Sequence, residues 1–218
     1  MVMSDSPTIS TPADSPHSPA NLISELCASF YRLGWVTGTG GGICIRAHSH
    51  KVYITPSGVQ KERIEPSHIF VLPYPQAEPS PHTDRISLRR PKLNLKEPAC
   101  TPLFWNAYTI RNAGSCINAH SQNAAMATLL WEKEKVFRIS HQVPIIDSMP
   151  NEADLKDSMK KAMEKYPRAA GILVLRHGIY VWGMSPSNHL GDVWQKAKTQ
   201  TEVRVKMKLA GLPTVLDE

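Results

Sequence analysis

The chain has 218 residues, 41% of them hydrophobic and 20% charged, and a formal net charge of +6 at pH 7. This composition suits one globular domain with a flexible end. A domain of this size can form a stable core without disulfides or structural metal ions. No apolar run is long enough to span a bilayer, and the first five residues lack the basic start and apolar stretch of a secretory leader. We therefore expect a soluble protein of the cytoplasm that does not bind a membrane.

The distribution of cysteines and basic residues argues against several further classes of protein. The four cysteines contain no C-x-x-C pair, which argues against a zinc ribbon and a disulfide framework, so we expect free thiols. The basic residues are spread out except for one cluster: Arg85, Arg89, Arg90, Lys92 and Lys96. This cluster lacks the interleaved aromatic residues on which bases stack. We expect it to be a solvated loop, or to attract a phosphorylated substrate, and we expect no nucleic acid as a partner.

The N-terminal residues predict a tail followed by a helix. Residues 1–19 are rich in Ser, Thr and Pro and too poor in apolar residues to form a core, so we predict a disordered tail over 1–19 and one folded domain over 20–218. Ser18 with Pro19 has the cap-plus-proline pattern that opens a helix, and Gly34 can end it. Apolar residues recur at helical spacing between them: Leu22, Ile23, Leu26, Phe30 and Leu33.

The segment that follows, residues 37–42 (TGTGGG), is rich in glycine. Glycines let backbone N–H groups approach a phosphate and threonines add hydroxyl donors, so this segment resembles an anion cradle. It lacks the Lys-Ser/Thr of a Walker A loop, and a strand follows it instead of the helix of a dinucleotide fingerprint. A tight turn between a helix and a strand is the alternative.

The remaining elements alternate between strands and helices. Short apolar runs predict strands at 43–45 and 52–55, the prolines of 73–81 predict an exposed loop, and Thr101 with Pro102 predicts a capped helix start. Further strands are predicted at 116–119, 143–146, 171–175 and 179–182, and further helices at 123–130, 154–166 and 193–209. This order indicates a three-layer α/β fold around a mostly antiparallel sheet.

Two histidines stand where a side chain can face a cleft. His120 follows the predicted strand 116–119, and His177 lies in the turn between the last two strands. Neutral imidazole is a common zinc ligand, so the two could share a metal; a solvent-facing or internally satisfied histidine is the alternative for each. His141 is a third candidate on the same grounds.

Five segments carry a resemblance to a known family. They are FYRLGWVTGTGGGI (30–43), ITPSGVQKERI (54–64), CTPLF (100–104), MATLL (126–130) and RHGIYVWG (176–183). Together they resemble the class II aldolase family, in the branch of the methylthioribulose-1-phosphate dehydratases. The resemblance covers nearly everything from residue 21 to residue 212.

The resemblance implies an enzyme of methionine salvage that removes water from 5-methylthioribulose 1-phosphate to give a diketone phosphate. Carried over by position, it implies that His120 and His177 bind zinc, that Cys100 lines the substrate site, and that the loops of Thr39 and Ser57 hold the phosphate. Aldolases of this fold usually have an acid near the position of Cys100, which favours a dehydratase. The resemblance also implies a homo-oligomer, a tetramer in many members of the fold.

The chain also departs from the pattern of this family. The family has His-x-His-Ser where this chain has Asn118-Ala119-His120-Ser121, and an amide oxygen is a poorer zinc ligand than an imidazole nitrogen. A family segment of roughly twenty residues that begins with a catalytic glutamate is missing before Val143, so no catalytic carboxylate is assigned. The last helix looks shortened after 199–202, and 184–191 resembles an insertion.

Three functions stay open on this evidence. The first is a zinc lyase of methionine salvage, impaired in this form. The second is a family member without catalysis that acts in oligomerisation or partner binding, and the third is a sugar-phosphate aldolase that uses the same metal and phosphate sites. The gaps fit a spliced variant, an imperfect gene model or a decayed paralogue, and His141 could supply a replacement ligand.

Overall fold

The computed structural model describes residues 18–47, 50–76, 86–138 and 142–183, together with Leu209 and Gly211. Almost all of the predicted tail lies outside these residues, as do His141 and all of the predicted final helix at 193–209 except Leu209. The same is true of the expected insertion at 184–191 and of the shortened segment after 199–202. Those expectations stay predictions.

An eight-stranded sheet runs through the described part of the chain, in the order β3-β2-β1-β4-β8-β7-β6-β5. The strands are β1 (Gly42–Ala47), β2 (Lys51–Ile54), β3 (Phe70–Pro73), β4 (Ser115–Ala119), β5 (Val136–Arg138), β6 (Gln142–Ile146), β7 (Gly171–Val174) and β8 (Gly178–Gly183). Within this sheet β6 and β7 pair in parallel, and every other neighbouring pair is antiparallel. The prediction of a mostly antiparallel sheet is confirmed.

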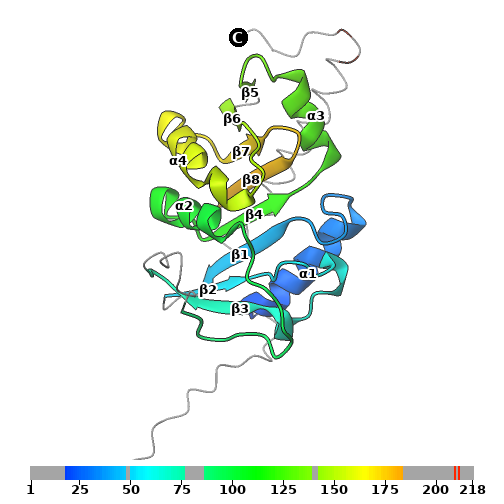
Figure 1. The fold of residues 1–218 in the computed structure, drawn as a ribbon, viewed down its shortest axis with the longest axis vertical. Coiled ribbons are helices and arrows are strands. Elements are labelled where there is room, and N and C mark those ends of the chain that lie inside the picture. Colours follow the sequence, from blue (N-terminus) through cyan, green and yellow to red (C-terminus); the bar gives the residue numbers. More distant parts are fainter. Residues whose placement is uncertain are drawn as a thin grey trace, which may run out of the picture.

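Helices cover both faces of this sheet. The helices α1 (Pro19–Arg32) and α3 (Gln122–Leu130) lie on one side, and α2 (Thr101–Arg111) and α4 (Lys156–Lys165) lie on the other (Figure 1). Each side has its own core: Ile23 and Phe30 of α1 pack into one cluster, and Phe104 of α2 and Met159 of α4 pack into the other. The α/β fold is therefore three-layered, as predicted.

The first helix begins where the sequence predicts. Ser18 is its N-cap, and the side-chain oxygen of Ser18 accepts a hydrogen bond from the backbone N–H of Asn21. Pro19 occupies the first turn, where a missing N–H costs nothing. The helix ends before Gly34, whose φ of +67° is a conformation that glycine adopts without strain.

Two other predicted helix starts need correction. The second helix, α2, begins at Thr101, so its N-cap is Cys100 and not Thr101. The Thr101 hydroxyl donates to the carbonyl oxygen of Pro98 at 2.7 Å and caps nothing. The helix predicted over 154–166 is confirmed as α4 (Lys156–Lys165), but its first residues belong to a 3-10 turn, η3 (Glu152–Leu155). Its predicted apolar face is confirmed, because Leu155, Met159 and Met163 are all buried.

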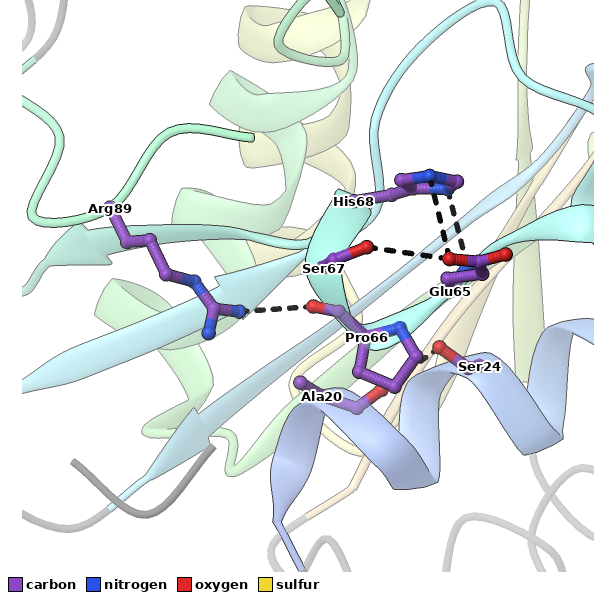
Figure 2. A network of polar contacts seen from close by, with 7 residues as sticks. All are labelled: Ala20, Ser24, Glu65, Pro66, Ser67, His68 and Arg89. Carbon is purple, nitrogen blue, oxygen red and sulfur yellow. Dashed lines mark hydrogen bonds and ion pairs between the residues drawn. The ribbon is translucent and has the colours of Figure 1, made fainter. Parts of the chain in front are cut away.

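A polar network fixes the edge of the sheet at β3 (Figure 2). The Arg89 guanidinium donates to the carbonyl oxygens of Pro66 and Ile69, and Arg89 pairs with Val71 of β3 through the backbone. Pro66 opens the short 3-10 helix η2 (Pro66–His68), where Glu65 accepts from the hydroxyl of Ser67. One member of the predicted basic cluster therefore has a structural role at this edge.

In the ranges that the structure describes, no helix is both long enough and apolar enough to cross a membrane.

Candidate functional site

The end of β4 and the turn between β7 and β8 meet at one point of the sheet. Ala119 pairs with Ile179 in the antiparallel register of β4 and β8, so the turn that holds His177 and Gly178 lies beside His120. The contact is so close that a Cβ on Gly178 would stand 2.1 Å from the carbonyl oxygen of Ala119. The backbone N–H of His120 donates to the carbonyl oxygen of Trp35 at 3.0 Å, which ties this point to the loop after α1.

The structure brings the two predicted histidines together. The ring centroids of His120 and His177 are 4.4 Å apart, and the rings meet edge to face. The Nε2 atoms of both rings are buried and take no hydrogen bond from the described residues. Burial lowers the pKa of His120 to about 4, with smaller contributions from the charges of His177 and Lys61. His120 is therefore neutral at pH 7 and keeps a lone pair for an electrophile.

A carboxylate that the sequence analysis missed completes this cluster. Ligand atoms of His120, Glu152 and His177 all lie within 4.8 Å of one another, which makes them a group that could hold a metal ion. Glu152 comes from η3 and is partly buried, whereas its chain neighbours Asn151 and Ala153 are exposed. A single glutamate before a helix has no pattern of its own in the sequence, so only the fold identifies it.

The glycine-rich segment lies directly against His120 and the end of β4. A Cβ on Gly40 would stand 2.4 Å from Nδ1 of His120, and a Cβ on Gly41 would stand 2.8 Å from the carbonyl oxygen of Asn118. Gly41 also has a φ of +79°. The glycines are therefore required for the close approach of this loop to the end of β4.

Lys61 joins the two loops that were predicted to hold a phosphate. Its ammonium group donates to the carbonyl oxygens of Thr39 and Val59, at 2.8 and 3.2 Å, and the side chain is almost entirely buried. Thr39 and Ser57 themselves are exposed. Burial lowers the pKa of Lys61, although the nearby thiols and Glu152 oppose this shift. The two predicted loops thus share one buried cation.

Cys100 lies behind this site in a buried position. It is 3% exposed, and a Cβ on Gly42 would stand 3.6 Å from its sulfur. Burial is the largest of the effects that raise the pKa of the Cys100 thiol well above its usual range, and the negative charge of Glu152 adds to it. Cys100 is therefore a neutral thiol, and not a nucleophile, at neutral pH.

Val143 is a core residue and does not lie at the candidate site. Its side chain is 4% exposed and packs in the core on the face covered by α1 and α3. Glu152 contacts Asn118 and Tyr180, and Tyr180 belongs to the core on the opposite face. A side chain at position 143 of this fold therefore points away from Glu152.

Comparison with solved structures supports the fold. An L-fuculose 1-phosphate aldolase superposes with a TM-score of 0.72, at 19% identity, over 95% of this chain and 94% of the other. The L-fuculose-1-phosphate aldolase from Thermus thermophilus superposes with a TM-score of 0.62, at 17% identity, over 87% and 92% of the two chains. At these identities the likeness shows a shared fold and nothing finer.

Comparison of sequences is more specific. The protein named methylthioribulose-1-phosphate dehydratase of Laccaria bicolor is 60% identical over the whole of both chains, and the one from Coprinopsis cinerea is 60% identical over 93% of this chain and 92% of its own. A protein of the same name from Aquarana catesbeiana is 45% identical over 89% of this chain and 86% of its own.

The alignment with the Laccaria protein also bears on the missing segment. It spans 247 positions, whereas this chain has 218 residues, so at least 29 positions lie opposite gaps in this chain.

The model of the class II aldolase and adducin N-terminal domain matches residues 21–196. The chain therefore belongs to the class II aldolase family, in its branch of methylthioribulose-1-phosphate dehydratases.

Proposed function

We propose that this chain is a zinc-dependent hydro-lyase of the cytoplasm that dehydrates 5-methylthioribulose 1-phosphate to 2,3-diketo-5-methylthiopentyl 1-phosphate, a step of methionine salvage. The observation that carries the proposal is the pair of imidazoles, His120 and His177, beside a glycine loop. Their rings meet, and their buried Nε2 atoms have no hydrogen-bond partner in the part of the chain that the structure describes. The full-length identity with proteins named for this reaction supports it.

The donor set fits a divalent ion. A buried ring nitrogen without a hydrogen-bond partner costs free energy unless a ligand uses its lone pair, and among the described residues the Nε2 atoms of His120 and His177 have no such partner. His120 and His177 would hold zinc through these nitrogens. When bound, zinc supplies a Lewis acid that polarises the ketone and the neighbouring hydroxyl of the substrate.

The other residues of the site would bind and orient the sugar phosphate. The exposed loops of Thr39 and Ser57 present backbone and hydroxyl donors to its phosphate. Lys61 holds these loops together and places a positive charge behind them. Cys100, a neutral thiol near Gly42, would line the substrate site from its buried position.

The dehydration also needs a group that transfers protons, and position 143 does not supply one in this chain. Position 143, where the family has its catalytic glutamate, holds a core valine. Loss of a general acid–base group commonly lowers a rate by about a hundred- to ten-thousand-fold. We therefore expect slow turnover.

The proposal is tested with purified full-length chain loaded with Zn²⁺ and supplied with 5-methylthioribulose 1-phosphate. We expect slow formation of the diketone phosphate, which a chelator abolishes and His177→Ala lowers at least tenfold by removing a zinc ligand. Absence of product from a zinc-loaded sample would overturn the proposal. Cleavage products in place of the diketone would instead indicate a sugar-phosphate aldolase.

A second function is favoured by Asn118 and by the gap positions opposite the Laccaria protein. It is a non-catalytic family member that keeps the fold for oligomerisation or for binding a partner. We also propose that either form is a homo-oligomer, a tetramer by family resemblance. Light scattering of the zinc-loaded chain tests the assembly, and an oligomer without turnover would support this second function.

A further inference from the structure

Two paired residues of neighbouring strands, Asn118 and Tyr180, connect the sheet to Glu152. Asn118 of β4 pairs with Gly42 of β1 on one side and with Tyr180 of β8 on the other. Directly paired residues of neighbouring strands point to the same face of a sheet, so Asn118 and Tyr180 project together. Both are buried, at 2% and 0% exposure.

Both of these side chains end at one carboxylate oxygen. The amide nitrogen of Asn118 donates to Oε1 of Glu152 at 2.6 Å, and the hydroxyl of Tyr180 hydrogen-bonds to the same Oε1. An amide can offer a carboxylate only its NH₂ group, so this contact fixes which way the Asn118 side chain is turned. Two donors on one oxygen restrict the orientation of the carboxylate.

The arrangement leaves the other carboxylate oxygen, Oε2, for a further partner. No hydrogen bond joins it to Asn118 or Tyr180, and Glu152 already lies in the cluster with His120 and His177. Donors that touch a ligand, and not the metal itself, are the usual means of orienting a metal-binding carboxylate. Two histidines and one glutamate form a known catalytic zinc set, which leaves a fourth position open for substrate.

We propose that Glu152 is the third protein ligand of the metal site in this chain and that Asn118 and Tyr180 are positioning residues that hold it there. The inference rests on the proposed function for the presence of a metal. It assigns a new ligand in place of the imidazole that family resemblance puts at position 118. Ligand atoms of Glu152 and the two histidines already lie within 4.8 Å of one another.

The competing arrangement makes Asn118 itself the third ligand. The Oδ1 atom of Asn118 is buried without a partner among the described residues, so it is free to bind an ion in principle. A neutral amide oxygen is the weaker donor, however, and an anionic carboxylate stands in the same cluster. In the arrangement that we propose, Asn118 affects the metal only through Glu152.

The two arrangements predict different double-mutant cycles for Zn²⁺ affinity, measured by competition with a chromophoric chelator. We expect Glu152→Gln to weaken binding at least about a hundredfold, and Asn118→Ala and Tyr180→Phe each to weaken it about tenfold in the parent chain. In the Glu152→Gln background, Asn118→Ala should add less than about threefold, because its effect passes through the missing carboxylate. Glu164→Gln, an exposed carboxylate on α4, is the matched control and should leave affinity unchanged.

Thermal unfolding of each variant in the presence of a chelator separates loss of the ligand from loss of the fold. A full tenfold loss on adding Asn118→Ala to Glu152→Gln would overturn the inference in favour of Asn118 as a direct ligand. Unchanged affinity of folded Glu152→Gln would overturn it as well, while leaving the proposed function intact. A parent chain that binds no Zn²⁺ would overturn both the inference and the proposed function.

Discussion

Gly40 lies so close to His120 that a Cβ on it would stand 2.4 Å from the imidazole Nδ1. The glycine loop and His120 therefore pack directly against each other, and a side chain at position 40 would displace the His120 ring. This contact is the physical link between the predicted phosphate loop and the predicted metal ligand.

Gly40→Ala should displace the ring of His120 and weaken Zn²⁺ binding at least about tenfold, because the ligand nitrogen moves away from its partners. Gly183→Ala is the matched control, since a Cβ on Gly183 meets nothing within 4 Å. Chelator competition measures both. Equal affinity in the two variants would show that the loop does not set the position of the ring.

Val143→Glu should not restore a catalytic carboxylate. The new charge would be buried without a partner in the core next to α1 and α3, so we expect a loss of at least about 3 kcal/mol in the free energy of unfolding. Gln142→Glu places the same group at the exposed neighbouring position and should be nearly neutral. Urea unfolding of both variants tests this, and a gain in turnover with Val143→Glu would contradict it.

Lys61→Met should raise the KM for the phosphorylated substrate at least about tenfold and change kcat less, because the variant removes a positive charge and the tie between two loops. Lys160→Met removes an exposed lysine of α4 and serves as the control. Steady-state kinetics on the zinc-loaded chain give both constants. A KM equal to that of the control would exclude Lys61 from phosphate binding.

Cys27 should resist alkylation in the native protein. Burial raises the pKa of its thiol from 9.0 to about 12, partly opposed by the charge of Lys61. At pH 8 the reactive thiolate is then about a thousandfold scarcer than in the unfolded chain, and iodoacetamide labelling with peptide mapping should show a matching difference in rate. Labelling of Cys27 at the unfolded rate would contradict the burial.

The same shift also has a consequence for stability. Above pH 9 the unfolded thiol loses its proton, whereas the folded thiol keeps it until about pH 12. The contribution of Cys27 to stability is therefore present below pH 9 and is lost as the pH rises through this window. Cys27→Ala should show a smaller loss of stability than the parent between pH 9 and pH 11 in denaturant titrations.

The sequence predicts those parts of the fold that local chemistry determines. The start of α1 follows from Ser18 and Pro19, and the buried face of α4 follows from the spacing of Met159 and Met163. The strands β3 and β5 were not predicted, because they are only four and three residues long and their pairing depends on partners elsewhere in the chain.

The candidate site likewise contains residues that the sequence predicts and residues that only the fold identifies. His120 and His177 could be chosen because each stands at the end of a strand, and in the structure their rings meet. Glu152 could not be chosen, because only the folded chain brings its carboxylate within hydrogen-bond distance of Asn118 and Tyr180. Asn118 looked like a plain loss of a ligand, but its hydrogen bond to Glu152 gives it a partner that only the folded chain brings near.

The most direct measurement of the central claim is the zinc content of the purified chain after loading with Zn²⁺ and removal of the excess. Two convergent imidazoles that hold one ion predict one zinc per chain, and none in His120→Ala/His177→Ala, which should remain folded because both side chains are only partly buried. A parent without zinc, or a double variant that retains a full equivalent, would contradict the account.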